Sequence, residues 1–316
     1  DKRNLFNDDR VCFFGISTDA ADENRPWVKE QIPGIRYFWD FDGLISRAYG
    51  ALSKQLSCET PPRQDRRFWV ILDPTLRVLK VFPMSADGKN LSEIFGYIET
   101  LPEPDAFCGF ELQPPILYLP NILEPELCKT LIGLYTAHGG TESGFMRDVD
   151  GKTLALLDSR HKRRMDYTIT EDSLIRTLQQ RIRTRVIPEI YKAHQFIATR
   201  MERYIVACYS DENHGHFGAH RDNTTKGTAH RKFAISINLN SDFEGGELIF
   251  PEYNRRGFKP PVGGAVIFSC SLLHKVSPVT KGQRYAFLPF LYDEAAAKLR
   301  LDNNVYLGST IGDYTG

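Results

Sequence analysis

The 316-residue sequence has no long apolar run, no excess of charge of either sign and no paired cysteine motif. No stretch approaches the roughly 20 apolar residues that a membrane-spanning helix needs, and the opening residues, DKRNLFNDDR, are not those of a secretory signal peptide. Forty basic residues balance forty acidic ones, so no overall field attracts nucleic acid or an anionic membrane. We therefore expect a globular, cytoplasmic protein with neither kind of partner.

The six cysteines are scattered along the chain, without a C-x-x-C pair or the density of a disulfide-stapled secreted domain. We interpret them as reduced, mostly structural thiols. Cys12 and Cys208 lie in strand-like runs, where we expect each to be a small buried apolar residue.

The first hundred residues alternate short apolar runs with helical stretches, which is typical of an α/β unit with a central sheet. The strand-like runs are VCFFGI, IRYFW, FWVILD and RVLKVF, and helices are predicted near residues 19–31, near 44–52 and from Leu91. A proline-rich segment, LPEPDAFCGFELQPPIL, then breaks both periodicities. We place the seam near residues 102–113, between a domain of residues 1–102 and one of residues 113–316.

The second half begins with helical spacing and ends in short β-rich runs. The helical stretches are EPELCKTLIGLYTAH and residues 171–194, and the β-rich runs are RMERYIVACY, FAISINL, GELIF, GAVIF and RYAFLPFLY. Helices followed by many short strands predict a sandwich or barrel buttressed by helices.

The densest chemistry lies in ENHGHFGAHRD, residues 212–222, and in His274, 52 positions after Asp222. On an extended strand His220 and Asp222 point to the same side, so they can hold one ion while His274 arrives from another strand. Two imidazoles and one carboxylate leave positions open on the metal, as oxygen-activating non-haem Fe(II) requires. An alternative is a cupin-like site of three histidines, formed by His214, His216 and His220.

With their surroundings these residues resemble the prolyl-4-hydroxylase-like branch of the 2-oxoglutarate and Fe(II) oxygenases. The resemblance covers roughly residues 113–295 and is carried by RKFAISINLNSDFEGGELIFPEYN and FKPPVGGAVIFSCSLLHKVSPVTKGQRYAFLPFLY. It includes the Gly-Gly-Glu turn at 245–247, the Pro-x-Gly turn at 261–263 and a basic residue, Arg284, ten positions after His274. It implies a double-stranded β-helix of jelly-roll type.

The resemblance also implies the cofactors and the reaction. Fe(II) would be held by His220, Asp222 and His274, and 2-oxoglutarate would chelate it while its far carboxylate meets Arg284; ascorbate is a further candidate cofactor. A guanidinium suits that carboxylate because it is a planar fork of donors that stays charged when desolvated. The implied outcome is hydroxylation of a C–H bond with release of succinate and CO2, with no catalytic group expected beyond the metal centre.

Tyr209 is a second candidate for co-substrate binding, since this family often has a tyrosine on the strand before H-x-D. Tyr209 lies eleven residues before His220, slightly farther than expected, which an insertion in SDENHGH would explain. The alternative is a plain amphipathic strand residue.

The polar stretch of residues 139–169 is too long for a tight connection, and it predicts a mobile lid or a disordered surface loop. Its Arg163 and Arg164, together with Arg255 in a later loop, are candidates for recognising an acidic or carboxylate-bearing substrate; the alternative is a solvated charged loop. We expect His214 and His216 at the mouth of the site. The substrate class, whether amino acid, peptide, protein or small molecule, and a homodimer are left open.

The runs VCFFGIS to YGAL and RRFWVILDPTLRVLKVF resemble the peroxiredoxin branch of the thioredoxin fold over about residues 5–100. In that family the peroxidatic cysteine precedes the strand that corresponds to VCFFGIS, so Cys12 does not match it, while Arg67 is the nearest match to the thiolate-supporting arginine. We favour a non-catalytic docking role for this domain. A fused thiol peroxidase, or an interaction protein with an inactive oxygenase fold, are the alternatives.

Overall fold

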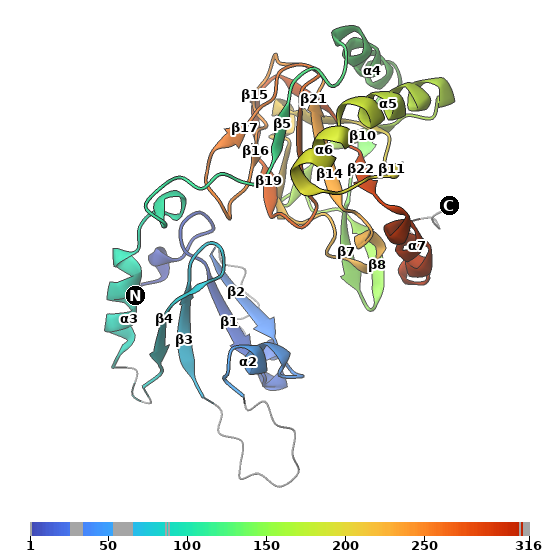
Figure 1. Ribbon diagram of the computed structural model, residues 1–316. Helices are drawn as coiled ribbons and strands as arrows, with labels where there is room; N and C mark the ends of the chain where they lie inside the picture. The colour runs from blue at the N-terminus through green and yellow to red at the C-terminus, as the bar shows by residue number, and fades with distance from the viewer. Residues whose placement is uncertain are drawn as a thin grey trace. The chain divides into compact units, whose positions relative to one another are not determined.

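The computed structural model describes residues 2–25, 34–52, 66–85, 87, 89–309 and 311. The chain divides into two compact units, Asp1–Leu112 and Gln113–Gly316. Each is described by itself, and Figure 1 labels their elements. Among the described helices, none is both long and apolar enough to cross a membrane.

The first unit contains a parallel pair of strands and an antiparallel hairpin. The elements are η1 (Arg3–Leu5), β1 (Phe13–Ser17), η2 (Ala20–Asn24), β2 (Ile35–Trp39), α2 (Leu44–Ala48), β3 (Phe68–Leu72), β4 (Val78–Pro83), α3 (Leu91–Thr100) and η3 (Pro104–Ala106). Ile71 of β3 and Phe82 of β4 pack with Ile94 and Ile98 of α3. The four predicted strands and the helices from residues 44 and 91 are thus confirmed.

Two expectations for this unit were wrong, and a third is tested only over the first part of its range. The described strands form two separate two-stranded ladders, β1–β2 and β3–β4, in place of one hydrogen-bonded central sheet. The helix expected near residues 19–31 is represented by the short 3-10 helix η2, and residues 26–33 lie outside the described part. Cys12 precedes β1 and is exposed, because its neighbour Phe13 takes the inward position.

The second unit contains two antiparallel sheets. The nine-stranded sheet consists of β5 (Leu117–Leu119), β6 (Thr141–Glu142), β10 (Met165–Thr168), β11 (Arg200–Glu202), β12 (Ile205–Ser210), β14 (Phe233–Asn238), β18 (Ala265–Ser269), β21 (Gln283–Phe287) and β22 (Phe290–Tyr292). The five-stranded sheet consists of β17 (Gly257–Phe258), β16 (Leu248–Ile249), β19 (His274–Val276), β13 (His216–His220) and β9 (Lys162–Arg163), in that order.

Two further ladders and several helices complete this unit. The ladders are β7 (Phe145–Val149) with β8 (Lys152–Leu156), and β15 (Glu244–Gly245) with β20 (Val279–Lys281). The helices are α4 (Pro125–His138), α5 (Asp172–Arg185), α6 (Ile187–His194), η4 (Asp211–Asn213), η5 (Lys226–Thr228), α7 (Glu294–Asp302) and η6 (Asn303–Tyr306). The helix predicted over residues 171–194 is two helices, because Pro188 in the first turn of α6 cannot continue the hydrogen bonding of α5.

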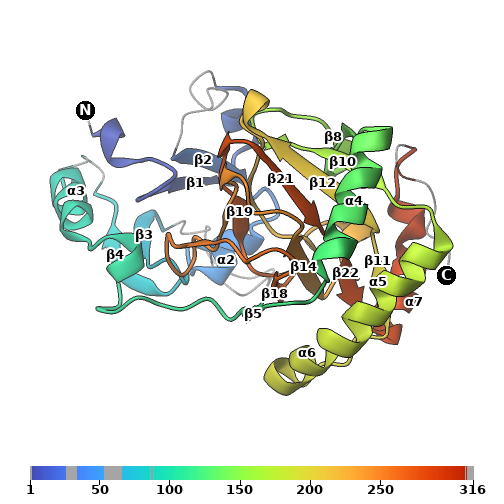
Figure 2. The ribbon, with the colours of Figure 1, turned by 90° about the horizontal axis from the view of Figure 1, so that it is seen from above.

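The central strands of the nine-stranded sheet, among them β12, β14 and β18, are buried on both faces. Val206 of β12 and Ile235 of β14 pack on one face with α4, α5 and α6; in Figure 2, α4 lies next to α5, and α6 continues from the end of α5. Ala207 and Tyr209 pack on the other face with residues of the five-stranded sheet. Because neighbours on a strand point to opposite faces, such strands appear as continuous apolar runs. The predicted helix-buttressed sandwich is therefore confirmed for this unit, and Cys208 is buried as expected.

The expectation of a mobile or disordered loop at residues 139–169 was wrong. The segment contains the five strands β6 to β10; β9 pairs with β13 of the small sheet, and β10 pairs with β12 of the large one. The chain therefore crosses from one sheet to the other at Arg164. Its charged residues misled the prediction because Lys162 and Arg164 are buried between the sheets and not solvated.

Replacing Leu178 by alanine tests the helix-covered face. The Leu178 side chain is fully buried against the large sheet. We expect Leu178→Ala to lower the free energy of unfolding by about 2–5 kcal/mol, since the substitution leaves a cavity in a packed core. Urea-induced unfolding followed by circular dichroism measures this change. The exposed Arg183 on the same helix supplies the control: Arg183→Ala should change stability by no more than about 0.5 kcal/mol. Equal effects of both substitutions would contradict this packing.

Candidate metal centre

Three side chains that can bind a metal lie together where β13 meets β19. His220 ends β13, Asp222 follows two positions later, and His274 begins β19 directly opposite His220. One ligand atom from each residue lies within 4.8 Å of those of the other two. Among the described residues, no second group of three His, Cys, Asp or Glu side chains lies this close together. The Nε2 atoms of His220 and His274 lie 3.5 and 3.4 Å from the two oxygens of the Asp222 carboxylate.

Backbone carbonyls set the orientation of both imidazoles. Nδ1 of His220 lies 2.8 Å from the Gly218 oxygen, and Nδ1 of His274 lies 3.0 Å from the Leu272 oxygen. Since a carbonyl can only accept, each Nδ1 carries the proton and donates it, which leaves Nε2 with a free lone pair. Both lone pairs face the Asp222 carboxylate, and this is the arrangement that a metal ion requires.

The charge states of these residues also suit a metal. Burial raises the pKa of Asp222, but His274 and His220 lower it more, so the carboxyl stays ionised with a pKa below its usual range. Burial and the neighbouring His220 lower the pKa of His274 to about 4. His274 is therefore neutral near pH 7, which is the form that coordinates metals.

A bulge and a clamp hold the two ligand-bearing segments together. The register of β13 against β19 shifts between Phe217 and His220, where β13 has the extra residue of a β-bulge. Glu252 accepts hydrogen bonds from Arg221 Nη2 at 2.6 Å and from the Leu273 amide at 3.2 Å. It thus joins the residue between His220 and Asp222 to the residue before His274. No local pattern in the sequence marks Glu252, because its partners lie 21 and 31 positions away.

Tyr209 and Arg284 form a second cluster on the inner face of the large sheet. They are directly opposite each other on β12 and β21, and the guanidinium carbon of Arg284 lies 5.3 Å from the centre of the Tyr209 ring. Arg284 donates from Nε to Asn238 Oδ1 at 3.0 Å and from Nη2 to Ser236 Oγ at 2.8 Å. Its Nη1 is buried without a hydrogen-bond partner. A buried donor of this kind is satisfied when a carboxylate binds.

Ser236 and Asn238 were missed by the sequence analysis, although the strand contains a signal. In FAISIN they are the polar residues at alternate positions of an otherwise apolar run, so they share one face of β14. That face is the inner one, and both side chains are buried there. Polar residues on the buried face of a strand indicate a partner across the sheet, which here is Arg284.

The remaining predicted residues lie apart from the metal group. His214 is exposed in a left-handed conformation, with φ of 52°, and the ring nitrogens of His216 lie 2.8 and 3.2 Å from the backbone oxygens of His214 and Arg160. The alternative with three histidines therefore has no common point for an ion. Arg163 donates to the Ser159 and Asn213 oxygens, at 2.9 and 2.7 Å.

The two other candidate arginines differ in burial. Arg255 is exposed, as expected for a loop. Arg164 is buried and bonded to Asp166, which contradicts the alternative that it belongs to a solvated charged loop. Burial follows from its place at the crossing between the two sheets, where side chains point into the shared core.

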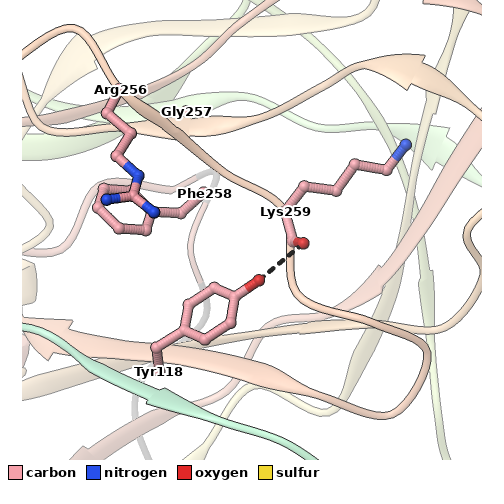
Figure 3. Close-up of a pocket in the computed structure, with 5 residues that line it drawn as sticks. All are labelled: Tyr118, Arg256, Gly257, Phe258 and Lys259. Atoms are coloured by element: carbon pink, nitrogen blue, oxygen red, sulfur yellow. Dashed lines mark hydrogen bonds between the residues drawn. The ribbon is translucent and has the colours of Figure 1, made fainter.

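A pocket of about 440 Å³ lies elsewhere on this unit, next to Arg255 in sequence (Figure 3). It is lined by Tyr118, Arg256, Gly257, Phe258 and Lys259. The Tyr118 hydroxyl donates to the Lys259 oxygen at 2.8 Å, which ties β5 to the segment after β17. No metal-binding side chain lines this pocket, so its chemistry is separate from that of the candidate centre.

Comparison with known proteins finds similarity within this unit. Residues 204–292 match the model of the 2OG-Fe(II) oxygenase superfamily. A PKHD-type hydroxylase of Pseudomonas putida is 30% identical over 122 residues, which cover 34% of this chain and 53% of that protein. A PKHD-type hydroxylase of Thioalkalivibrio sulfidiphilus is 29% identical over 144 residues, which cover 43% and 62%. The chain thus spans little more than half the length of these relatives.

Two solved structures share a lower identity with the chain. A prolyl hydroxylase from Trichoplax adhaerens, in complex with a hypoxia inducible factor oxygen degradation domain peptide fragment, is 18% identical, with a TM-score of 0.44 over 59% of this chain and 87% of its own. A Pseudomonas putida prolyl-4-hydroxylase is 15% identical, with a TM-score of 0.42 over 58% and 94%.

The family implies Fe(II) and 2-oxoglutarate as cofactors, and the residues present fit both. Two neutral imidazoles and an ionised carboxylate are a suitable ligand set for Fe(II). The buried, unpaired donor of Arg284 suits a carboxylate of 2-oxoglutarate.

The clamp at Glu252 can be tested through metal binding. We expect Glu252→Gln to weaken binding of Co(II), used as a stable substitute for Fe(II), by about ten-fold or more, because outer groups that orient ligands typically affect affinity by this much. Calorimetric titration of the metal-free protein measures the affinity. The exposed Glu244, paired with Lys281, provides the matched control Glu244→Gln. If both variants bind Co(II) like the original protein, Glu252 does not orient the ligands.

Proposed function

We propose that the unit of residues 113–316 is an Fe(II)- and 2-oxoglutarate-dependent dioxygenase that hydroxylates a C–H bond of an amino-acid, peptide, protein or small-molecule substrate, releasing succinate and CO2. The observation that carries the proposal is the group of His220, Asp222 and His274, found in the same unit as a buried arginine with an unpaired donor. The match of residues 204–292 to the oxygenase family supports it.

The three ligands would hold the iron through the His220 and His274 Nε2 atoms and the Asp222 carboxylate. Once bound with 2-oxoglutarate, Fe(II) supplies the activation of O2 that an unactivated C–H bond requires. The protein's part is to fix these ligands and to keep water away. Phe250 and Phe268 support the second task, since both are buried and their rings lie 6.3 and 4.6 Å from the His274 ring.

Arg284 would bind the far carboxylate of 2-oxoglutarate, and Tyr209 would line the same site. Asn238 and Ser236 hold two of the guanidinium nitrogens, so the third is directed without further loss of side-chain freedom. The Tyr209 hydroxyl lies 3.4 Å from Arg164 Nη1, and the same ring lies against Arg284, so Tyr209 separates two guanidinium groups. Ascorbate remains a candidate reductant.

The substrate site is also a proposal. The curated relatives carry the name PKHD-type hydroxylase, and we extend to this chain only a peptide or small-molecule substrate. Arg163, Arg164, Arg255, His214 and His216 remain the candidate contacts taken from the sequence. A cytoplasmic location and a homodimer also stay predictions.

For the first unit we propose a thioredoxin-like docking domain without peroxidase activity. The parallel pair β1–β2, the hairpin β3–β4 and the following helix α3 support a redoxin-like order of elements. Although Cys12 is exposed as a whole, partial desolvation of its sulfur and the nearby Asp8 raise the pKa of the thiol, which is opposite to the change that activates a peroxidatic cysteine. Arg67, the candidate supporting arginine, is exposed.

Turnover of 2-oxoglutarate without substrate tests the co-substrate site. We expect the iron-loaded protein to form succinate slowly from 2-oxoglutarate, and Arg284→Gln to raise the KM for 2-oxoglutarate at least about thirty-fold, since a hydrogen bond to a buried charged group contributes about 2 kcal/mol or more. Mass spectrometry of succinate measures the rate. Arg255→Gln, which changes an exposed arginine, should leave the KM unchanged. A normal KM in Arg284→Gln would show that the co-substrate binds elsewhere.

A further inference from the structure

Three cations surround a single carboxylate between the two sheets. They are Lys162 of β9, Arg164 at the crossing between sheets, and Arg203 just before β12; the carboxylate is Asp166 of β10. Asp166 accepts from Arg164 Nε and Nη2, both at 2.7 Å, and from Arg203 Nη2 at 3.2 Å. One carboxylate therefore serves both guanidinium groups and has little capacity for a third cation.

Lys162 has only neutral partners. Its Nζ donates to Ser143 Oγ at 2.8 Å and to the Gly144 oxygen at 2.6 Å, and it lies 4.8 Å from the centre of the Phe217 ring. Within the part of the chain that the structure describes, no carboxylate pairs with it. Only 4% of the residue is exposed, so water does not supply the missing stabilisation. A buried ammonium without a counter-charge is strongly disfavoured.

The net positive charge of the cluster lowers the pKa values of cations within it. Burial and the nearby Arg164 and Arg203 lower the pKa of Lys162 well below its usual range. Burial and Arg164 lower the pKa of Arg203 to about 10. The nearby carboxylates, Asp166 and Asp222, do not reverse either change. An additional negative charge would stabilise all three cations.

The backbone at Arg203 is held in a conformation that arginine rarely adopts. Its φ is 72°, in the left-handed region, which costs a residue with a Cβ more than it costs glycine. This turn between β11 and β12 directs the side chain toward Asp166. Backbone strain of this kind persists where the surrounding structure enforces it, and it is common at binding sites.

The cluster lies next to both parts of the proposed active site. Arg164 Nη1 lies 3.4 Å from the Tyr209 hydroxyl, and the strand that follows Arg164, β10, pairs with the edge of β12 opposite to β21, which carries Arg284. The Phe217 ring beneath Lys162 stacks on the imidazole of His220, with 3.5 Å between ring centres. A group bound by the three cations would thus be one side chain from a metal ligand.

We propose that Lys162, Arg164 and Arg203 form a binding site for a carboxylate group of the substrate, separate from the co-substrate site at Arg284. The inference rests on the proposed function and narrows the substrate to an acidic molecule. The carboxylate belongs either to the C-terminus of an amino acid or short peptide or to an acidic side chain. Its negative charge supplies the counter-charge that the cluster lacks. Its oxygens would accept hydrogen bonds from donors of the cluster whose present partners are neutral or only distant.

Binding of small carboxylates tests the site directly. The probes are N-acetylglycine, with a terminal carboxylate, N-acetyl-aspartate amide, with a side-chain carboxylate, and the neutral N-acetylglycinamide. Each is titrated calorimetrically at constant ionic strength into protein loaded with Zn(II) and the unreactive analogue N-oxalylglycine, and into metal-free protein. We expect at least one carboxylate to bind ten-fold more tightly than the neutral probe, and the better one identifies the source.

Two variants connect the binding to the cluster. Lys162→Met and Arg203→Met should each weaken carboxylate binding at least ten-fold, while Arg183→Gln, at an exposed arginine of α5, should not change it. Lys162→Met should also keep or raise the melting temperature, because it removes a buried unpaired cation; a purely structural lysine would give a lower one. Any of three results would overturn the proposal. They are tighter binding of the neutral probe than of either carboxylate, no carboxylate binding at probe concentrations up to 50-fold above that of the protein, and unchanged carboxylate binding in both variants.

The 2-oxoglutarate assignment and the carboxylate site of the cluster can be contradicted independently of each other. If N-oxalylglycine does not bind but the carboxylates still do and depend on Lys162, the 2-oxoglutarate assignment is wrong and the anion site stands. If N-oxalylglycine binds and depends on Arg284 while the carboxylates do not bind, the oxygenase assignment stands and the anion site is wrong.

Discussion

The antiparallel pairing of β13 with β19 is the interaction on which the candidate centre depends. It places His220 opposite His274, and the two histidines come from segments more than fifty positions apart. A slip of one residue would turn one imidazole to the opposite face of the sheet. The bulge after Phe217, the carbonyl contacts of both Nδ1 atoms and the Glu252 clamp all fix this register. The position of Asp222 follows, since it lies two residues after His220.

A second constraint is that charged side chains buried between the two sheets must be paired with opposite charge. Helices cover the outer face of the large sheet with apolar side chains, but its inner face carries Arg284, and Arg164 and Lys162 are buried where the chain crosses between the two sheets. Asp166 offsets the charge of Arg164, whereas Arg284 has only neutral partners and one unpaired nitrogen. This imbalance is costly for the protein alone and favourable once anions bind. Co-substrate and substrate binding therefore have one physical origin in this account.

The sequence was informative where the chemistry is local or matches a spacing, and less so where it depends on distant partners. The H-x-D pair and His274 came from residue types and spacing, and the strands β12 and β14 came from their β-rich runs. The strands in residues 139–169 were missed because several have only two residues and their polar residues satisfy one another inside the sandwich. Glu252 could not be assigned, because nothing local distinguishes it from a surface acid. In the first unit, ladder pairing between β1 and β3 cannot be decided from apolar runs alone.

Anaerobic addition of Fe(II) and 2-oxoglutarate to the metal-free protein tests the central claim most directly, through the weak visible charge-transfer band of a chelated iron. The account predicts that the band appears in the original protein and is lost in His274→Ala, with the exposed-residue variant Glu244→Gln as a control that keeps it. Iron binding without any band would contradict the claim, and it would favour an interaction protein built on an inactive oxygenase fold.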